Sequence, residues 1–144
     1  MPAKIKRKIN SPNHLIEVYL DRSDTASKSE SFALTLPVGS QQVPEHYHEK
    51  LEELFLITEG EVKFIVSGES FIAKAGDFIP VQRGTLHGFG HHGEIDSKMW
   101  VTTVGEAGLL DYLKEVSDIL NADLSESEKK QKISALFDHY DAKV

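Results

Sequence analysis

The chain has 144 residues, of which 40% are hydrophobic, so it can form one domain with a real core and is too short for two comfortable ones. Its net charge of −7 disfavours nucleic acid and anionic membranes as partners, and the absence of cysteine excludes disulfides and thiolate metal sites. Every apolar run is far shorter than a membrane span or a signal-peptide core, and we therefore expect a cytoplasmic protein.

The first part of the chain predicts short strands separated by polar loops. Residues 1–13 are polar, and we expect them to follow the surface or to cover a sheet edge. Residues 14–20 alternate loosely, and residues 32–36 have the period of two that is typical of a strand. Residues 21–31, rich in Ser, Asp and Lys, predict a loop, and Pro44 precedes a short strand that carries histidines.

Turn signals then recur at short intervals up to Gly105. The strands expected between them cover residues 53–58, 61–66, 69–73, 77–81, 85–89 and 98–104. Ser67–Gly68 predicts a hairpin turn, and 90–93 predicts a loop. About eight or nine short strands with glycine turns indicate a mainly β domain over residues 1–105, either an antiparallel double sheet or a barrel.

After Gly105 the apolar period changes from that of strands to that of helices. A first amphipathic helix is indicated by the spacing of Leu109, Leu110, Leu113, Val116, Ile119 and Leu120. Ser125 and Glu128 form a capping box, which opens a second helix. Its apolar stripe is expected to contain Ile133, Leu136, Phe137 and Tyr140. We expect residues 106–144 to form a helical extension that packs on the barrel or on a partner subunit.

Three histidines and one carboxylate predict a metal site. His46 and His48 lie two residues apart, so on a strand both side chains point to the same face and can bind one ion together. Glu53 follows five residues later, and His87 ends a second run that is punctuated by glycine. Neutral imidazoles and a carboxylate are ligands that suit Fe, Mn, Ni, Cu or Zn.

Glu53 has a rival in its neighbour Glu52. Glu53 shares a strand face with Phe55 and Ile57, so that face is expected to point inward. A carboxylate among such side chains is costly unless it is paired or bound to a cation, which favours Glu53 as the ligand. The remaining histidines are expected to lie outside the site: His14, His91, His92 and His139.

Both halves of this pattern resemble the two motifs of the cupin superfamily. The first is Gly39-x6-His46-x-His48-x4-Glu53-x6-Gly60, and the second is Gly76-x7-Gly84-x2-His87. The resemblance is tight over about residues 32–89. It implies a jelly-roll β-barrel with His46, His48, Glu53 and His87 as metal ligands. The layout is most similar to single-domain, quercetin-dioxygenase-like cupins that carry helices after the barrel.

Three positions depart from these motifs without touching a candidate ligand. Six residues rather than five separate Gly39 from His46, Gln82 stands where proline is expected, and His91 stands where asparagine is expected. These differences bear on the subfamily more than on metal binding.

The resemblance implies one divalent transition metal, with Fe, Mn or Ni favoured and Zn or Cu possible. Four protein ligands leave one or two positions open, as catalytic sites require. We expect a dioxygenase-type oxidoreductase acting with O2 on a small flavonol, diketone or enediol-like molecule. In quercetinase-like relatives the glutamate at the position of Glu53 is also the catalytic base.

Two alternatives remain open at this point. The first is an isomerase, lyase or decarboxylase that uses the same metal without oxygen, and the second is a non-enzymatic module that binds a small molecule. We also expect a homodimer, because cupin-like barrels commonly pair through their sheet edges. The expected pocket neighbours are Phe55, Ile57, Phe89 and Tyr47, with Gln41, Gln82 or Arg83 near the rim.

Overall fold

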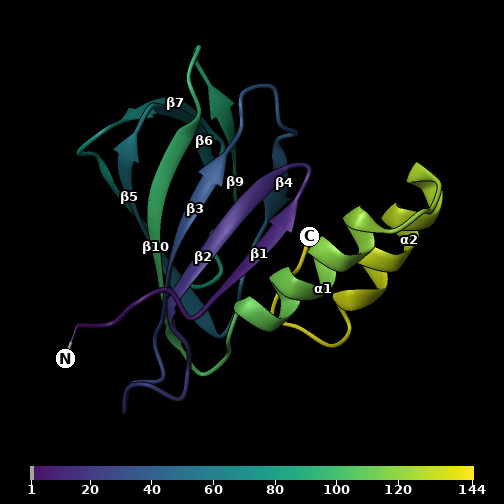
Figure 1. Ribbon diagram of the computed structural model, residues 1–144, viewed down its shortest axis with the longest axis horizontal. Helices are drawn as coiled ribbons and strands as arrows, with labels where there is room; N and C mark the ends of the chain where they lie inside the picture. The colour runs from purple at the N-terminus through teal and green to yellow at the C-terminus, as the bar shows by residue number, and fades with distance from the viewer. Residues whose placement is uncertain (1) are drawn as a thin grey trace.

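A computed structural model describes residues 2–144, and in them ten β-strands precede two α-helices (Figure 1). The strands are β1 (Arg7–Ser11), β2 (His14–Leu20), β3 (Glu30–Leu36), β4 (Val43–His46), β5 (Leu51–Glu59), β6 (Glu61–Val66), β7 (Glu69–Lys74), β8 (Phe78–Val81), β9 (His87–His92) and β10 (Ser97–Gly105). The helices are α1 (Leu110–Asn121) and α2 (Glu126–Leu136). Within this part of the chain, neither helix has the length and apolar character needed to cross a membrane.

The strands form two antiparallel sheets whose inner faces enclose the core. One sheet has the order β1-β2-β3-β10-β5-β8, and the other has the order β4-β9-β6-β7. Neighbouring strands are therefore mostly distant in sequence, as in a double-stranded β-helix. The expected jelly roll is confirmed. Among residues 2–144 no ladder of hydrogen bonds joins the two sheets, so the barrel consists of two facing sheets rather than one closed cylinder.

Aromatic side chains from both sheets interlock in the core. Phe55 on β5 lies with its ring centroid 5.4 Å from that of Phe64 on β6 and 5.6 Å from that of Phe89 on β9. All three are less than 10% exposed. Strand β5 alternates strictly at its start, with Leu51, Glu53 and Phe55 buried, so the inward face predicted from the period of two is confirmed.

Two glycines let strands and turns approach more closely than a side chain would allow. At Gly60, between β5 and β6, φ is +68° and a Cβ would lie 2.7 Å from the backbone oxygen of Asp96. At Gly88 on β9, a Cβ would lie 2.8 Å from the backbone oxygen of Val43. The second contact lets β4 lie close against β9, which brings the histidines of both strands together.

Some element boundaries differ from those expected. Residues 7–11, expected to be a polar surface segment or an edge cover, form the edge strand β1, which pairs with β2. Ile9 is 2% exposed, so this strand also contributes to the core. The predicted loop over 21–31 ends early, because β3 already begins at Glu30. Strand β9 runs on to His92, so the expected loop at 90–93 is wrong for most of its length.

The carboxylate of Glu30, at the start of β3, is buried because it binds the first turn of α1. Its two oxygens accept hydrogen bonds from the backbone N–H groups of Leu109 (2.6 Å) and Leu110 (3.2 Å). The side chain therefore caps the N-terminus of α1 from a distant strand. Its negative charge is also attracted to the partial positive charge at that end of the helix. This long-range cap fixes where α1 leaves the barrel.

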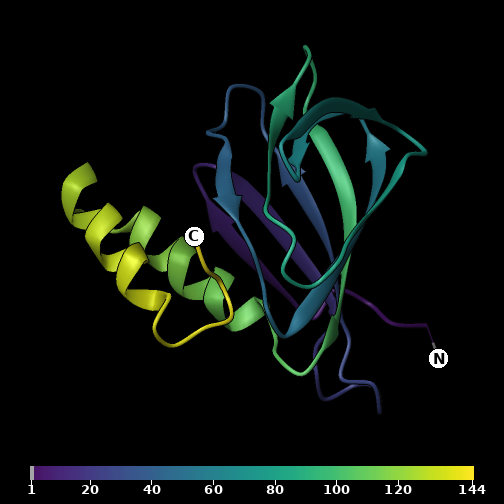
Figure 2. The same ribbon diagram turned by 180° about the vertical axis from the view of Figure 1, so that it is seen from behind.

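The two helices lie side by side against the edge of the barrel formed by β1 and β4 (Figures 1 and 2). The predicted start of the second helix is confirmed with Ser125 as its N-cap, because Ser125 Oγ accepts a hydrogen bond from Glu128 N at 3.1 Å. The predicted stripe on the second helix is wrong at its end: Phe137 is the C-cap, and Tyr140 lies beyond the helix. Tyr140 instead packs on α1, with its ring centroid 5.7 Å from that of Tyr112.

Candidate metal centre

The four predicted ligands come from both sheets and meet between them. His46 ends β4 and pairs directly with His87, the first residue of β9. His48 follows β4 by two residues, and Glu53 points inward from β5 in the opposite sheet. The strand pairing thus brings together residues that are up to 41 positions apart in sequence.

The donor atoms of this cluster face a common point. One ligand atom from each of the four residues lies within 4.8 Å of the others. Glu53 Oε1 is 2.8 Å from His48 Nε2 and 3.0 Å from His87 Nε2, and the His46 and His87 ring centroids are 4.4 Å apart. His48, Glu53 and His87 are almost fully buried, whereas His46 is only partly covered.

Each histidine uses its second ring nitrogen, Nδ1, to donate a hydrogen bond to a backbone carbonyl. The acceptors are Pro44 O at 2.8 Å for His46, Thr85 O at 2.8 Å for His87 and Asp141 O for His48. A carbonyl oxygen accepts but cannot donate, so Nδ1 carries the proton in each ring. The Nε2 lone pairs are therefore left to face the cluster, as in metal-bound histidines whose orientation is fixed by an outer partner.

When all three rings are neutral, this arrangement brings several acceptors together without a positive charge to hold them. In the neutral tautomer, His48 Nε2 is an acceptor, and it lies 2.8 Å from the carboxylate of Glu53, which also only accepts when ionised. Within residues 2–144 this buried nitrogen makes no hydrogen bond. A cation at the common point satisfies all four groups, so the residues fit a divalent metal.

The local pKa shifts follow from burial and from the short contacts between Glu53 and the histidines. Burial lowers the pKa of His46 to about 4, which keeps its imidazole neutral at pH 7. Burial opposes ionisation of Glu53, but His48 and His87 outweigh it and hold its pKa well below the usual range. Burial likewise lowers the pKa of His48, but the nearby Glu53 carboxylate outweighs that effect and raises it.

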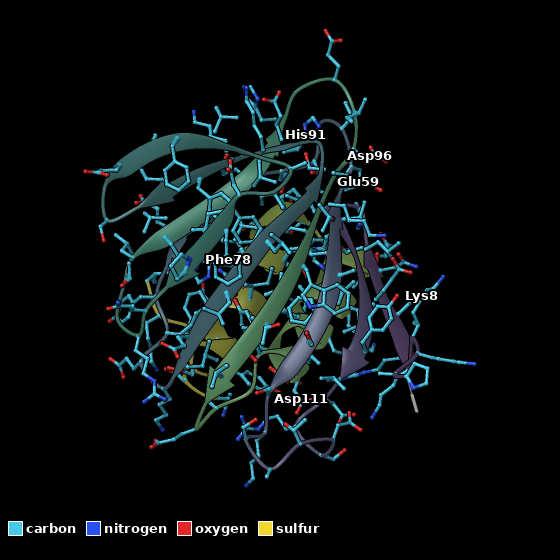
Figure 3. The ribbon with its side chains drawn as sticks, turned by 90° about the vertical axis from the view of Figure 1, so that its left-hand side faces the viewer. Lys8, Glu59, Phe78, His91, Asp96 and Asp111 are labelled. Atoms are coloured by element: carbon cyan, nitrogen blue, oxygen red, sulfur yellow. The ribbon has the colours of Figure 1, made fainter. Side chains whose placement is uncertain are left out.

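The other candidates lie outside the cluster. Glu52 is on the opposite face of β5 and is only half-buried, so the structure favours Glu53 over its rival. His91 Nε2 donates a hydrogen bond to the backbone oxygen of Ile95 at 2.7 Å across a turn, near Asp96 and Glu59 at the upper end of Figure 3. The same view shows the helices behind the strands, so they cover one side of the barrel only.

A cavity of about 660 Å³ leads from the cluster to the helices, and His46, His48 and Glu53 form one end of its wall. Of the expected pocket neighbours, Phe55, Phe89 and Gln41 line it. The others are absent from its lining: Ile57, Tyr47, Gln82 and Arg83. His14, which is expected to be unrelated to the site, lies on the cavity wall without being a member of the cluster.

Two further contributors have no local signal in the sequence. Asp141 accepts from the ring of His48 through its backbone oxygen, and α1 and α2 supply apolar side chains to the cavity. The amphipathic period of α1 predicts an apolar face, but it does not say which surface that face covers. Only the fold reveals that both elements belong to the site.

Comparison with known proteins agrees with this fold. At 22% identity, a predicted oxalate decarboxylase from Thermotoga maritima aligns over 74% of this chain and 100% of its own, with a TM-score of 0.66. KdgF from Halomonas sp. aligns over 72% of this chain and 90% of its own, with 15% identity and a TM-score of 0.62. The cupin domain of Cnp3 from Schizosaccharomyces pombe aligns over 74% of both chains, with 16% identity and a TM-score of 0.58.

These likenesses are below 25% identity and concern the fold alone. No curated protein matches the chain. The Cupin domain family, however, matches residues 32–104, which are more than half of the chain and include all four residues of the cluster. The two-sheet barrel, the histidine–glutamate cluster and this match together place the chain in the cupin family.

Proposed function

We propose that this cupin is a metal-dependent oxidoreductase of the dioxygenase type that acts on a small, oxygen-bearing organic molecule. The observation that carries the proposal is the buried set of three Nε2 atoms and one carboxylate at the end of a mainly apolar cavity. Such a set suits a first-row transition metal, and four protein ligands would leave one or two coordination positions for a substrate.

A bound divalent metal would supply Lewis acidity to a substrate oxygen and, with Fe or Ni, redox chemistry with O2. The protein's own groups do the rest. His48 and His87 hold the carboxylate of Glu53 in place, and Glu53 is the only one of the four groups that is anionic at neutral pH. It therefore both favours a cation and is placed to accept a proton from a substrate hydroxyl in the cavity.

Redox-neutral chemistry on the same cluster is the second candidate. The Thermotoga maritima protein described as a predicted oxalate decarboxylase shares the fold. A decarboxylation on this cluster would use the metal without net oxidation of the substrate. The apolar cavity favours the first candidate, because a small dianion such as oxalate would leave most of its wall uncovered. A binding module without turnover is the third possibility.

Metal content of untagged protein, reconstituted in turn with Fe(II), Mn, Ni and Zn, tests the proposal. His48→Ala is expected to lose nearly the full equivalent of bound metal while keeping the fold, measured by elemental analysis and circular dichroism. His139→Ala is the matched control, because His139 is exposed and outside the cluster. Equal metal content in all three proteins would contradict the assigned ligands.

Oxygen uptake then separates the candidate reactions. The Fe or Ni form is expected to consume O2 with flavonols, diketones or enediols, and His48→Ala is expected to consume none. Loss of substrate without O2 consumption would favour the decarboxylase or isomerase alternative. Tight binding without any conversion would favour the binding module.

A further inference from the structure

The cavity beside the metal centre has one wall from the barrel and one from the helices. Leu34, Phe55 and Phe89 line it on the barrel side. On the helix side it is lined by Leu113, Val116, Leu120, Ile133 and Phe137. We call this space between barrel and helices the chamber. Its volume of about 660 Å³ lies within the range of about 300–1,000 Å³ that is usual for ligand sites.

The inner face of α1 is apolar but incompletely covered. Leu113, Val116 and Leu120 follow one another at spacings of three and four residues, so they lie on one helix face. All three are only partly buried, whereas the barrel side chains opposite them are buried. Their apolar surface thus borders the chamber and is available to a ligand within it.

Few side chains of the chamber lining are charged. Glu53 belongs to the metal centre, and the others are exposed or only partly buried: Glu45, Glu126, Lys129 and Lys130. Two further titratable groups of the lining are neutral at pH 7, because burial lowers the pKa of His14 and raises that of Tyr112 to about 12. His14 is moreover engaged with Ser117, whose Oγ is 3.0 Å from its Nε2.

We propose that the chamber takes an amphipathic substrate, whose oxygen-bearing end lies at His46, His48 and Glu53 and whose hydrocarbon body lies between the barrel and the helices. This inference rests on the proposed metal centre and adds the substrate class. A small hydrophilic substrate would cover little of the apolar wall, whereas a hydrocarbon body covers it and displaces water from it. The helical extension therefore sets specificity.

A series of n-alkyl hydroxamates tests this inference, because every member offers the same two oxygens to the metal and only the chain differs. Affinity for the Ni-loaded full chain, measured by titration calorimetry, is expected to rise up to about fourfold per methylene until the chain fills the chamber. An affinity that is independent of chain length would overturn the inference.

Val116→Phe narrows the chamber from α1, and Ser134→Phe narrows it from α2, where Ser134 is exposed and on the lining. In both variants the affinity is expected to stop rising at a shorter chain than in the parent. For the eight-carbon hydroxamate the affinity should be about tenfold or more below that of the parent if two methylenes are displaced from the chamber. Acetohydroxamate should bind them as it binds the parent. Ile119→Phe is the matched control on α1, because Ile119 is absent from the lining.

Two outcomes separate failure of this inference from failure of the metal centre. If acetohydroxamate and its longer homologues all fail to bind the parent protein, the metal centre itself is contradicted. If acetohydroxamate binds but Val116→Phe, Ser134→Phe and Ile119→Phe leave the preference for long chains unchanged, the metal centre stands and the chamber is not where the hydrocarbon binds.

Discussion

Glu53 is 4% exposed, and its Oε1 lies 2.8 Å and 3.0 Å from the Nε2 atoms of His48 and His87. An ionised carboxylate in such a buried place is costly unless a positive charge compensates it. Without a metal, that charge must be a proton on one of the histidines. With a metal, the ion replaces the proton, so metal and proton compete for the same cluster.

Glu53→Gln is expected to weaken metal binding by more than the 10- to 100-fold that is typical of changes to groups around the ligands. The amide keeps the shape of the side chain but removes the negative charge that balances the ion. Competition with a chromogenic chelator measures the change in affinity. Glu52→Gln is the matched control on the same strand, and it should leave affinity within about twofold because its side chain lies on the other face.

If Glu52→Gln weakens metal binding and Glu53→Gln does not, the roles of the two carboxylates are exchanged. Glu53 is predictable as the inward carboxylate because a strand imposes a strict period of two, which puts Glu53 on the face of Phe55 and Ile57, and the structure places it there. No such constraint applies to His14, which lies on the chamber wall although the sequence predicts no part for it in the site.

At the scale of elements, the C-terminal segment 141–143 holds the loop that carries His48. Asp141 accepts from the backbone N–H groups of Glu49 (2.8 Å) and Lys50 (2.7 Å) through its carboxylate and from the His48 ring through its backbone oxygen. Lys143 and Tyr47 exchange two backbone hydrogen bonds of 2.9 Å. The segment thus fixes both the loop and the orientation of one ligand.

Asp141→Ala is expected to lower metal affinity by about 10- to 100-fold, because the loop loses its two carboxylate contacts and His48 is held less firmly. Metal titration of the folded variant measures this. Asp138→Ala is the control from the same segment: Asp138 is exposed and has no side-chain hydrogen bond among the described residues. Asp141→Asn should recover part of the affinity, since its amide oxygen can still accept from one of the two N–H groups.

An unchanged affinity in Asp141→Ala would show that His48 keeps its orientation without the carboxylate contacts. The sequence could not predict this role, because residues 48 and 141 are far apart and no local pattern links them. The same holds for Glu30 as the cap of α1 and for Tyr140, which leaves the predicted helix stripe to pack on Tyr112. Elements follow from local periodicity, whereas the contacts between them depend on the fold.

At the scale of the whole molecule, a few polar contacts and an apolar face hold the helices on the barrel. Asn121 Nδ2 donates to the backbone oxygen of Asn10 on β1 at 2.6 Å, and His14 on β2 meets Ser117 on α1. Leu110 is 1% exposed and belongs to the barrel core, so the start of α1 packs on the barrel of its own chain. The expected homodimer stays a prediction, which sedimentation of the full chain can measure.

Because His14 joins barrel and helix, its protonation is expected to affect the stability of the whole fold. Burial lowers its pKa in the folded protein below the ordinary value of 6.5. Between the unfolded and the folded pKa, the unfolded chain therefore binds more protons than the folded one. The free energy of unfolding must fall as pH falls through this window, by at most about 1.4 kcal/mol per pH unit for this group.

Urea unfolding of the metal-free protein at pH 7.5, 6.5, 5.5 and 4.5 measures this dependence, with His14→Gln beside the parent. The metal centre is the same in both proteins, so the difference between their free energies of unfolding isolates His14. Glutamine can still hydrogen-bond Ser117 but does not titrate, so the variant should lose less stability than the parent below pH 6.5. Two curves that stay parallel down to pH 4.5 would show that His14 keeps its ordinary pKa in the fold, and that the junction of barrel and helices is open enough to hydrate the charged ring.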